Sequence, residues 1–214
     1  MKIKKENLLL YAVTDRCGCK YGEFIKRVES ALKGGVTCLQ LREKGLDRAS
    51  LLNEALEVKA LCKKYNVPFI INDSVDLALE IGADGVHVGQ EDMRADDVRR
   101  KAGDKLIVGV SAHSVEEALA AEAAGADYLG CGAVFVTSTK SDVTPLGFET
   151  LREICAAVSI PVVAIGGING YNITELAGSG IDGVAVASAV FGAENVNSAC
   201  GELKSLVEKV TENG

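Results

Sequence analysis

The amino-acid sequence predicts a single-domain α/β protein, a (β/α)8 TIM barrel that occupies residues 1–214. Eight apolar, strand-like runs alternate with segments of helical periodicity from one end of the chain to the other. The connections are short, and no linker, low-complexity segment or shift of composition marks a second domain. A length of 214 residues suits one α/β barrel. A doubly wound open sheet is the alternative that the same alternation permits.

The eight expected strands are apolar runs that end in polar residues. They cover residues 8–15, 36–44, 68–73, 85–90, 105–113, 127–135, 161–168 and 182–190.

Helical segments fill the gaps between these strands. Asp47 is the expected N-cap of the segment after the second strand. Ser114 and Glu117 have the spacing of a capping box after the fifth strand. Three helix-to-strand junctions share one pattern, "GADGV", "GADYL" and "GIDGV", in which glycine suits a helix C-cap. The apolar stripe of the helix after the second strand is expected to comprise Leu51, Leu52, Ala55, Leu56, Val58 and Leu61.

Composition limits the classes of partner. The formal charge is −7 and the basic residues are scattered, which argues against a nucleic-acid-binding face. The apolar run at 8–13 is too short for a signal peptide, and no segment is long enough to span a membrane. The seven cysteines form no CxxC pair, which favours reduced thiols in a cytoplasmic protein.

Polar residues follow every expected strand, and the carboxyl ends of barrel strands meet at one rim. In "QLREK", Gln40, Arg42 and Lys44 fall at alternate positions and therefore share one face of a strand. Three donors on one face would suit an anionic ligand. The strand-end segments are "TDR" (14–16), "QLREK" (40–44), "ND" (72–73), "GQED" (89–92), "SAH" (111–113), "TSTK" (137–140), "GGI" (166–168) and "AS" (187–188).

Asp73 and Asp92 end consecutive strands, so their carboxylates are expected to lie close together at the rim. Magnesium is typically held by one or two carboxylates together with substrate phosphates. The alternative is that each aspartate caps the helix that follows it. Because Lys44 and Lys140 are expected nearby, the metal site is favoured over helix capping.

Two other segments carry groups suited to phosphate. The segment 137–147 supplies hydroxyls and Lys140, although its composition equally fits a solvated Ser/Thr loop. Gly166, Gly167 and Ser188 end the seventh and eighth strands, where this fold usually binds phosphate, and paired glycines also suit a tight turn. His87 is expected to pack inside the barrel.

These motifs together resemble the thiamine-phosphate synthase family. The similarity extends from about residue 10 to about residue 190 and includes "YAVTD", "QLREK", "IIND", "GADGVHVGQED", "VGVSAHS", "GADYLGCGAVFVTSTK", "PVVAIGGI" and "GVAVASAV". The resemblance implies a magnesium-dependent transferase of thiamine biosynthesis. Such an enzyme joins 4-amino-2-methyl-5-(diphosphooxymethyl)pyrimidine to a plain or carboxylated thiazole phosphate, and releases thiamine phosphate and diphosphate.

The resemblance also implies roles for particular residues. The catalytic residues would be Arg42, Lys44, Ser111 and Lys140. The substrate-binding residues would be Gln40, Leu41, Arg42, Glu43, Lys44, Asn72, Ser111 and Lys140 for the pyrimidine diphosphate, and Thr137, Thr139, Gly167, Ala187 and Ser188 for the thiazole phosphate. Mg²⁺ would be bound by Asp73 and Asp92.

Two alternatives share this barrel. A thiazole tautomerase-like protein would lack many of the residues that bind diphosphate and metal. This sequence retains such residues, which argues against that alternative: Arg42, Lys44, Asp73, Asp92 and Lys140. A non-catalytic barrel could instead bind thiamine precursors and regulate a partner. The sequence leaves the oligomeric state open, a homo-oligomer included.

Overall fold

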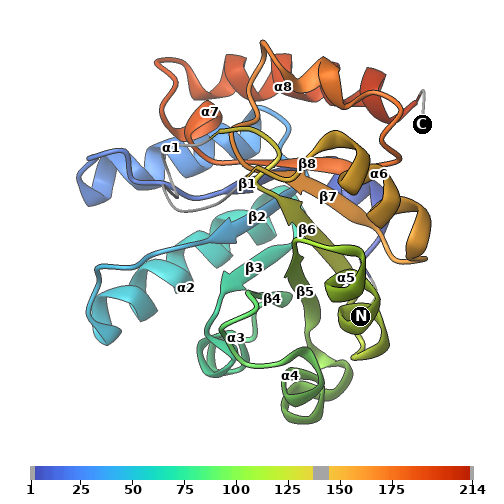
Figure 1. Ribbon diagram of the computed structural model, residues 1–214. Coiled ribbons are helices and arrows are strands. Elements are labelled where there is room, and N and C mark those ends of the chain that lie inside the picture. The colour runs from blue at the N-terminus through green and yellow to red at the C-terminus, as the bar shows by residue number, and fades with distance from the viewer. Residues whose placement is uncertain (1–2, 137–144, 213–214) are drawn as a thin grey trace.

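Eight parallel strands close into a barrel with helices around its outside (Figure 1). The structure is a computed structural model that describes residues 3–136 and 145–212. Each strand pairs with the next along the chain, and β8 pairs with β1 through the Leu10–Val184 register. The predicted fold class is therefore confirmed, and the open sheet is excluded. The strands are β1 (Leu10–Val13), β2 (Cys38–Leu41), β3 (Phe69–Asn72), β4 (Gly85–Val88), β5 (Ile107–Ala112), β6 (Tyr128–Gly132), β7 (Val162–Ile165) and β8 (Gly183–Val186).

The strands are shorter than the sequence predicted, and residues 188–190, expected in the last strand, lie in a helix. Asp73 has φ of +60°, so β3 stops at Asn72. The peptide bond between Gly132 and Ala133 is cis, and β6 stops there. The residues that follow each strand therefore belong to the rim of the barrel.

Helices follow the strands in order. They are α1 (Tyr21–Lys33), α2 (Arg48–Tyr65), α3 (Val75–Ile81), α4 (Ala95–Ala102), α5 (Val115–Ala123), α6 (Phe148–Ala157), α7 (Ser188–Phe191) and α8 (Val196–Thr211), with short 3-10 helices η1 (Lys5–Leu8), η2 (Gly103–Lys105) and η3 (Ile173–Leu176). The connection from β7 to β8 carries only η3 in place of an α-helix. Gly178 and Gly180 both have positive φ there and end the helical path early.

Two apolar layers stabilise the barrel. The larger layer fills the space between the outer faces of the strands and the helices and includes Val28, Val58 and Leu151. A smaller cluster fills the barrel interior and comprises Leu8, Tyr11, Val13, Cys38, Ile70, Ile107, Tyr128, Val163 and Ala185. All seven cysteines are free thiols, as expected, and four of them are buried.

The predicted helix starts are largely confirmed. The Asp47 carboxylate accepts hydrogen bonds from the backbone N–H groups of Ala49 and Ser50. The Ser114 hydroxyl accepts one from the N–H of Glu117, but the Glu117 carboxylate binds the N–H of His113 rather than that of Ser114.

The predicted stripe on α2 is confirmed only in part. Ala55 and Val58 are fully buried, and Leu51, Leu52 and Leu61 are partly buried against the core. Leu56, however, is 46% exposed. Its place on the helical wheel lies at the margin of the buried face, where the sequence pattern cannot separate a core residue from a surface one.

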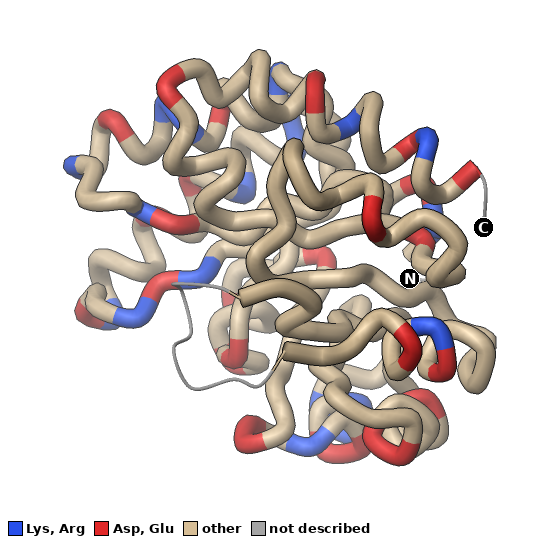
Figure 2. The backbone as a smooth tube through the Cα atoms, turned by 45° about the horizontal axis from the view of Figure 1, so that its top comes forward, with Lys and Arg blue, Asp and Glu red and all other residues tan. Residues whose placement is uncertain are grey.

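In the view of Figure 2, charged residues of both signs are interspersed over the outer helices. None of the helices within residues 3–136 and 145–212 is long and apolar enough to cross a membrane.

The aspartates of the three repeated junctions fix neighbouring strands to each other. Asp84 precedes β4, and its carboxylate accepts a 2.9 Å hydrogen bond from the N–H of Phe69 in β3. Asp127 accepts one of 2.8 Å from the N–H of Val108, and Asp182 accepts one of 2.9 Å from Val162. The shared sequence pattern is thus a structural device at the amino ends of the strands.

Replacing one of these aspartates should destabilise the fold. We expect Asp84→Ala to lower the free energy of unfolding by about 1–3 kcal/mol, because a partly buried backbone N–H loses its acceptor. Asp84→Asn retains an oxygen acceptor and should lose less. Urea denaturation measures both, with the exposed Glu175→Ala as control. A loss for Asp84→Ala no larger than that of the control would contradict this role.

Candidate active site at the carboxyl rim of the barrel

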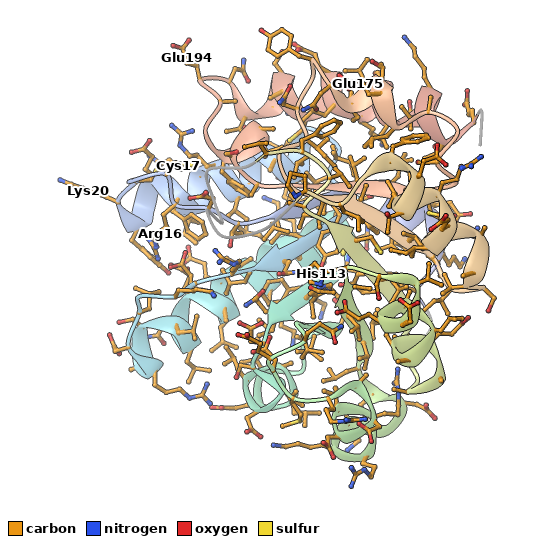
Figure 3. The ribbon with its side chains drawn as sticks, viewed as in Figure 1. Arg16, Cys17, Lys20, His113, Glu175 and Glu194 are labelled. Atoms are coloured by element: carbon orange, nitrogen blue, oxygen red, sulfur yellow. The ribbon has the colours of Figure 1, made fainter. Side chains whose placement is uncertain are left out.

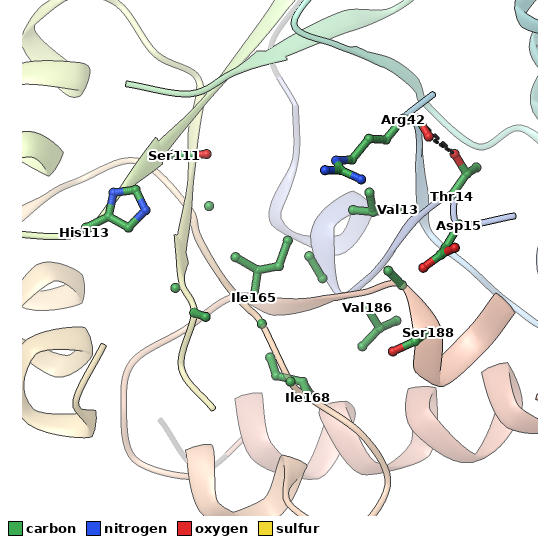
Figure 4. A pocket seen from close by; sticks show the side chains of 17 residues that line it. Val13, Thr14, Asp15, Arg42, Ser111, His113, Ile165, Ile168, Val186 and Ser188 are labelled. Atoms are coloured by element: carbon green, nitrogen blue, oxygen red, sulfur yellow. Dashed lines mark hydrogen bonds between the residues drawn. The ribbon is translucent and has the colours of Figure 1, made fainter. Parts of the chain in front are cut away.

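A cavity of about 150 Å³ opens at the carboxyl ends of the strands (Figure 4). Its lining comes from the ends of β1, β2 and β5 to β8, so residues far apart in the sequence meet there. The polar and charged lining residues are Thr14, Asp15, Arg42, Ser111, His113 and Ser188.

A second, deeper cavity of about 100 Å³ lies within the barrel. Gln40, Asn72 and His87 line this deeper cavity but not the outer one. Six residues line both, namely Val13, Arg42, Ser111, Gly130, Ile165 and Ala185. The two cavities therefore share walls, with Arg42 and Ser111 as their shared polar side chains.

Arg42 is positioned through its own backbone. The buried Thr14 hydroxyl accepts a 2.9 Å hydrogen bond from the N–H of Arg42 and donates a 3.4 Å bond to its carbonyl. The N–H of Thr14 also donates to the carbonyl of Gln40 at 2.9 Å. The Arg42 guanidinium extends toward the open centre of the cavity (Figure 4). The Thr14 contacts therefore fix the backbone from which this cation extends.

Arg16 connects the loop after β1 to the "QLREK" segment. Its guanidinium donates to the Glu43 carboxylate at 3.0 Å, forms an ion pair with Glu54 in α2, and lies 4.8 Å from the centre of the Phe24 ring. Figure 3 shows Arg16 between α1 and α2. The Glu43 carboxylate is thereby paired with a cation from the loop after β1.

Glu54 is a buried carboxylate with one ion-pair partner. Its side chain is fully buried, and its Oε1 atom accepts no hydrogen bond from any residue that the structure describes. Burial raises the pKa of the Glu54 carboxyl, while the charge of Arg16 opposes the rise and that of Glu43 adds to it. The loops after β1 and β2 are thus joined to each other and to α2 through an ion-pair network.

Asp73 and Asp92 converge at the rim, as the sequence suggested they could. Burial raises the pKa of the Asp73 carboxyl, and a hydrogen bond with Asp92 and its negative charge raise it further. The positive charges of Lys44 and Arg42 act on the same carboxyl in the opposite direction. Two carboxylates and two cations are therefore close enough to influence one another.

The alternative role of these aspartates as helix caps is excluded. The N-cap of α3 is Ser74, whose hydroxyl accepts the N–H of Leu77. The N-cap of α4 is Arg94. Asp92 instead accepts a 2.8 Å hydrogen bond from the N–H of Gly89, which closes the turn after β4.

The loops after β7 and β8 meet the same cavity. Gly166 and Gly167 both have positive φ, and a Cβ on Gly167 would lie 2.6 Å from the carbonyl oxygen of Val136. Only glycine therefore fits this approach of two loops. Ala187 and Ser188 stand at the start of α7, where the first backbone N–H groups of a helix have no partner within it.

The structure brings most of the predicted site residues together. Gln40, Arg42, Asn72, Ser111, Gly167, Ala187 and Ser188 line one or both cavities. Lys44 is exposed in the bend after β2, beyond the strand in which the sequence placed it. The Leu41 side chain is buried in the layer between strands and helices. Thr137, Thr139 and Lys140 lie outside the described residues.

Sequence reasoning missed three contributors. Thr14 was predicted only as part of a polar strand end, and its hydrogen bonds to the backbone of Arg42 were not anticipated. Tyr11 and Tyr128 were counted as apolar strand residues. Their hydroxyls bind each other inside the barrel at 2.8 Å, which no local pattern indicates.

Comparison with known proteins decides the family. A family model described as thiamine monophosphate synthase matches residues 10–190. The chain belongs to the thiamine monophosphate synthase family. Relatives named thiamine-phosphate synthase from Clostridium tetani and Pyrococcus abyssi are each 47% identical to it. The matches cover 95% and 96% of this chain, and 97% and 98% of those proteins. The resemblance inferred from the motifs is confirmed.

Solved structures agree with this assignment. Thiamine phosphate pyrophosphorylase from Pyrococcus furiosus has a TM-score of 0.88 and 43% identity, and the match covers 96% of this chain and 98% of that one. (S)-3-O-geranylgeranylglyceryl phosphate synthase from Thermoplasma acidophilum, with a TM-score of 0.70 and 16% identity, shares the fold alone.

The buried Glu54 of this thiamine monophosphate synthase family member should give stability a defined pH dependence. Because its folded pKa is raised above the ordinary value of 4.5, the native state holds this proton more tightly than the unfolded chain. Its contribution is fully present below pH 4.5 and is lost as pH rises through the folded pKa. The stability of the wild type relative to Glu54→Gln should therefore fall as pH rises.

Urea denaturation of both proteins from about pH 4.5 to about pH 7.5 measures this difference. Glu57→Gln, on the exposed side of α2, is the matched control and should show no such trend. A wild type that gains stability over Glu54→Gln with rising pH would show that attraction to Arg16 outweighs burial.

Proposed function

We propose that this protein is a thiamine-phosphate synthase, a transferase that joins a hydroxymethylpyrimidine diphosphate to a thiazole phosphate. The observation that carries the proposal is that Arg42, Lys44 and Asp92 all lie close enough to Asp73 at the rim for their charges to act on its carboxyl. Paired carboxylates beside two cations match a diphosphate together with its metal ion. The family assignment and the relatives' names support the same activity.

The diphosphate would lie beside "QLREK". Arg42 presents a planar guanidinium that can bind phosphate oxygens through two hydrogen bonds. Its backbone is clamped by Thr14, so the point from which the side chain extends is set before the ligand arrives. Lys44 adds a second positive charge, and the Ser111 hydroxyl adds a donor on the opposite wall of the cavity. Lys140 would be a further cation by the family resemblance.

Asp73 and Asp92 have the chemistry to hold Mg²⁺. Neither is used as a helix cap, and the mutual repulsion that raises the Asp73 pKa would be relieved by a divalent cation. No group of three or more His, Cys, Asp or Glu side chains suited to a metal occurs in residues 3–136 and 145–212. A two-carboxylate site fits magnesium, which completes its coordination with water and phosphate oxygens. Bound there, the ion would neutralise charge on the diphosphate.

The thiazole phosphate would lie across the cavity from the diphosphate. Gly167 leaves backbone unobstructed by any side chain, and Ala187 and Ser188 offer the N–H groups at the start of α7. Thr137 and Thr139 are assigned to the same phosphate by the family resemblance alone.

The chain's residues would then favour departure of the diphosphate. The bond between the pyrimidine methylene carbon and the diphosphate oxygen breaks, and its electron pair leaves with the diphosphate. Arg42, Lys44 and Ser111 stabilise the charge that grows on that oxygen, where fixed donors contribute most. The thiazole nitrogen gives its lone pair to the methylene carbon, and the new C–N bond forms. No side-chain base is required, because no proton is removed in these steps.

The two alternatives are less well supported. A tautomerase-like protein has no need for two convergent carboxylates beside Arg42. A regulator without catalysis would need no cations placed on a leaving group. The relatives that are 47% identical are named as synthases.

Reconstitution tests the proposal directly. We expect the purified protein, supplied with the pyrimidine diphosphate, thiazole phosphate and Mg²⁺, to form thiamine phosphate and diphosphate in equal amounts. Chromatography of both products measures this, and omission of each component in turn is the control. Saturable binding of a thiazole phosphate with no diphosphate released would move the assignment to one of the alternatives.

Substitution of a proposed metal ligand tests the Mg²⁺ site. We expect Asp92→Asn to lower kcat/KM by ~10²–10³-fold, the scale of losing one preorganised electrostatic contact, and to raise the Mg²⁺ concentration needed for half-maximal rate. The neighbouring exposed Glu91→Gln is the matched control and should retain wild-type kinetics. An Asp92→Asn variant with an unchanged Mg²⁺ titration and normal urea denaturation would remove Asp92 from the site.

A further inference from the structure

A continuous chain of hydrogen bonds crosses the barrel interior beneath the active-site cavity. The Gln40 amide nitrogen donates to the Tyr11 hydroxyl at 2.8 Å, and the Tyr11 and Tyr128 hydroxyls are 2.8 Å apart. The Tyr128 hydroxyl is 3.0 Å from His87 Nδ1, and His87 Nε2 is 3.0 Å from the Ser111 hydroxyl. Five strands contribute one residue each to this chain, namely β1, β2, β4, β5 and β6. It ends at a residue that lines both cavities.

The donor at one end fixes the first bond and is compatible with one continuous direction along the rest. A Gln amide nitrogen can only donate, so the Tyr11 oxygen accepts from Gln40 and its own proton is free for Tyr128. With Tyr11 donating to it, the Tyr128 hydroxyl can donate its own proton to His87 Nδ1. A neutral imidazole that accepts at Nδ1 carries its proton at Nε2, from which it donates to Ser111.

The interior is shaped to hold this chain. A Cβ on Gly109 would lie 2.1 Å from Tyr128 Cζ and 2.5 Å from His87 Nδ1, and one on Gly130 would lie 3.0 Å from the His87 ring. Both tyrosines are essentially buried, and burial raises the pKa of each hydroxyl well above its ordinary value. Each phenol therefore keeps the proton that the chain requires it to donate.

We propose that Tyr11, Tyr128 and His87 are positioning residues that turn the Ser111 hydroxyl into a hydrogen-bond donor toward the active-site cavity. Because His87 Nε2–H donates to the Ser111 oxygen, the serine proton is left without an acceptor among the residues that the structure describes. It points to the cavity, where the oxygen of an anionic ligand can accept it. This inference rests on the proposed function only for the identity of that ligand, a diphosphate.

The position of the His87 proton is the first test. The chain contains two histidines, so its ¹⁵N-histidine NMR spectrum is simple, and His113→Asn assigns the signals. We expect the Nε2–H tautomer at His87 in the wild type. In Tyr128→Phe, Nδ1 loses its donor and the Nδ1–H form should become populated. A wild-type His87 with its proton on Nδ1 would overturn the proposal, because Ser111 would then donate to the ring.

Binding of inorganic diphosphate with Mg²⁺ is the second test. We expect Tyr128→Phe and Ser111→Ala each to weaken it by roughly fivefold to tenfold, the scale of one hydrogen bond. If Tyr128 acts through Ser111, the double variant should bind no more weakly than Ser111→Ala alone. Additive losses would mean that Tyr128 only supports packing, and the positioning role would fall. The exposed Tyr171→Phe is the control.

These readouts separate the inference from the proposed function. The tautomer of His87 and the coupling between Tyr128 and Ser111 are measured without turnover. Both results therefore test the inference even if no thiamine phosphate is formed. If Tyr128→Phe does not fold, Tyr11→Phe replaces it. That variant keeps the bond from Tyr128 to His87 but removes the donor that sets its direction, and it should also give mixed tautomers at His87.

Discussion

Closure of the barrel through β8 and β1 is the constraint on which the site depends. Every strand is parallel to its neighbours, so closure brings all the carboxyl ends to one rim. Arg42 and Ser188 are distant in sequence, yet both line one cavity there. The chemistry-bearing residues can therefore sit on short loops, because the strands beneath them determine where each loop begins.

The opposite end of the barrel has a different task. Asp84, Asp127 and Asp182 each join an even-numbered strand to the strand before it. Thr37 does the same for β2, since its hydroxyl accepts a 2.9 Å hydrogen bond from the N–H of Leu10 in β1. The four junctions together link the strands in pairs around the barrel. Stability is thus supported at one end, while the charged groups that repel each other are gathered at the other.

Much of this architecture was predictable because it is local. Alternation of strand and helix patterns gave the barrel, and strand ends placed Arg42, Ser111 and Asp73 at one rim. Other features depend on contacts that the sequence does not display. Ser74 rather than Asp73 caps α3, since the two candidates are adjacent and only the backbone turn at Asp73 decides between them. The ion pair of Glu43 with Arg16 is one of these, because the two residues are distant in sequence and no local pattern indicates it.

The tight fit around Gly109 has a consequence for how this interior can change over time. Gly109 and Tyr128 are register partners on β5 and β6, and even one methyl group at Gly109 would overlap the phenol ring. A larger residue at 109 becomes acceptable only after the side chain at 128 has shrunk, and shrinking it first leaves a void beside His87. Either substitution alone therefore worsens the packing of the barrel interior, whereas the two substitutions together can preserve it. Descendants of this sequence are therefore expected to alter the two positions together or to leave both alone.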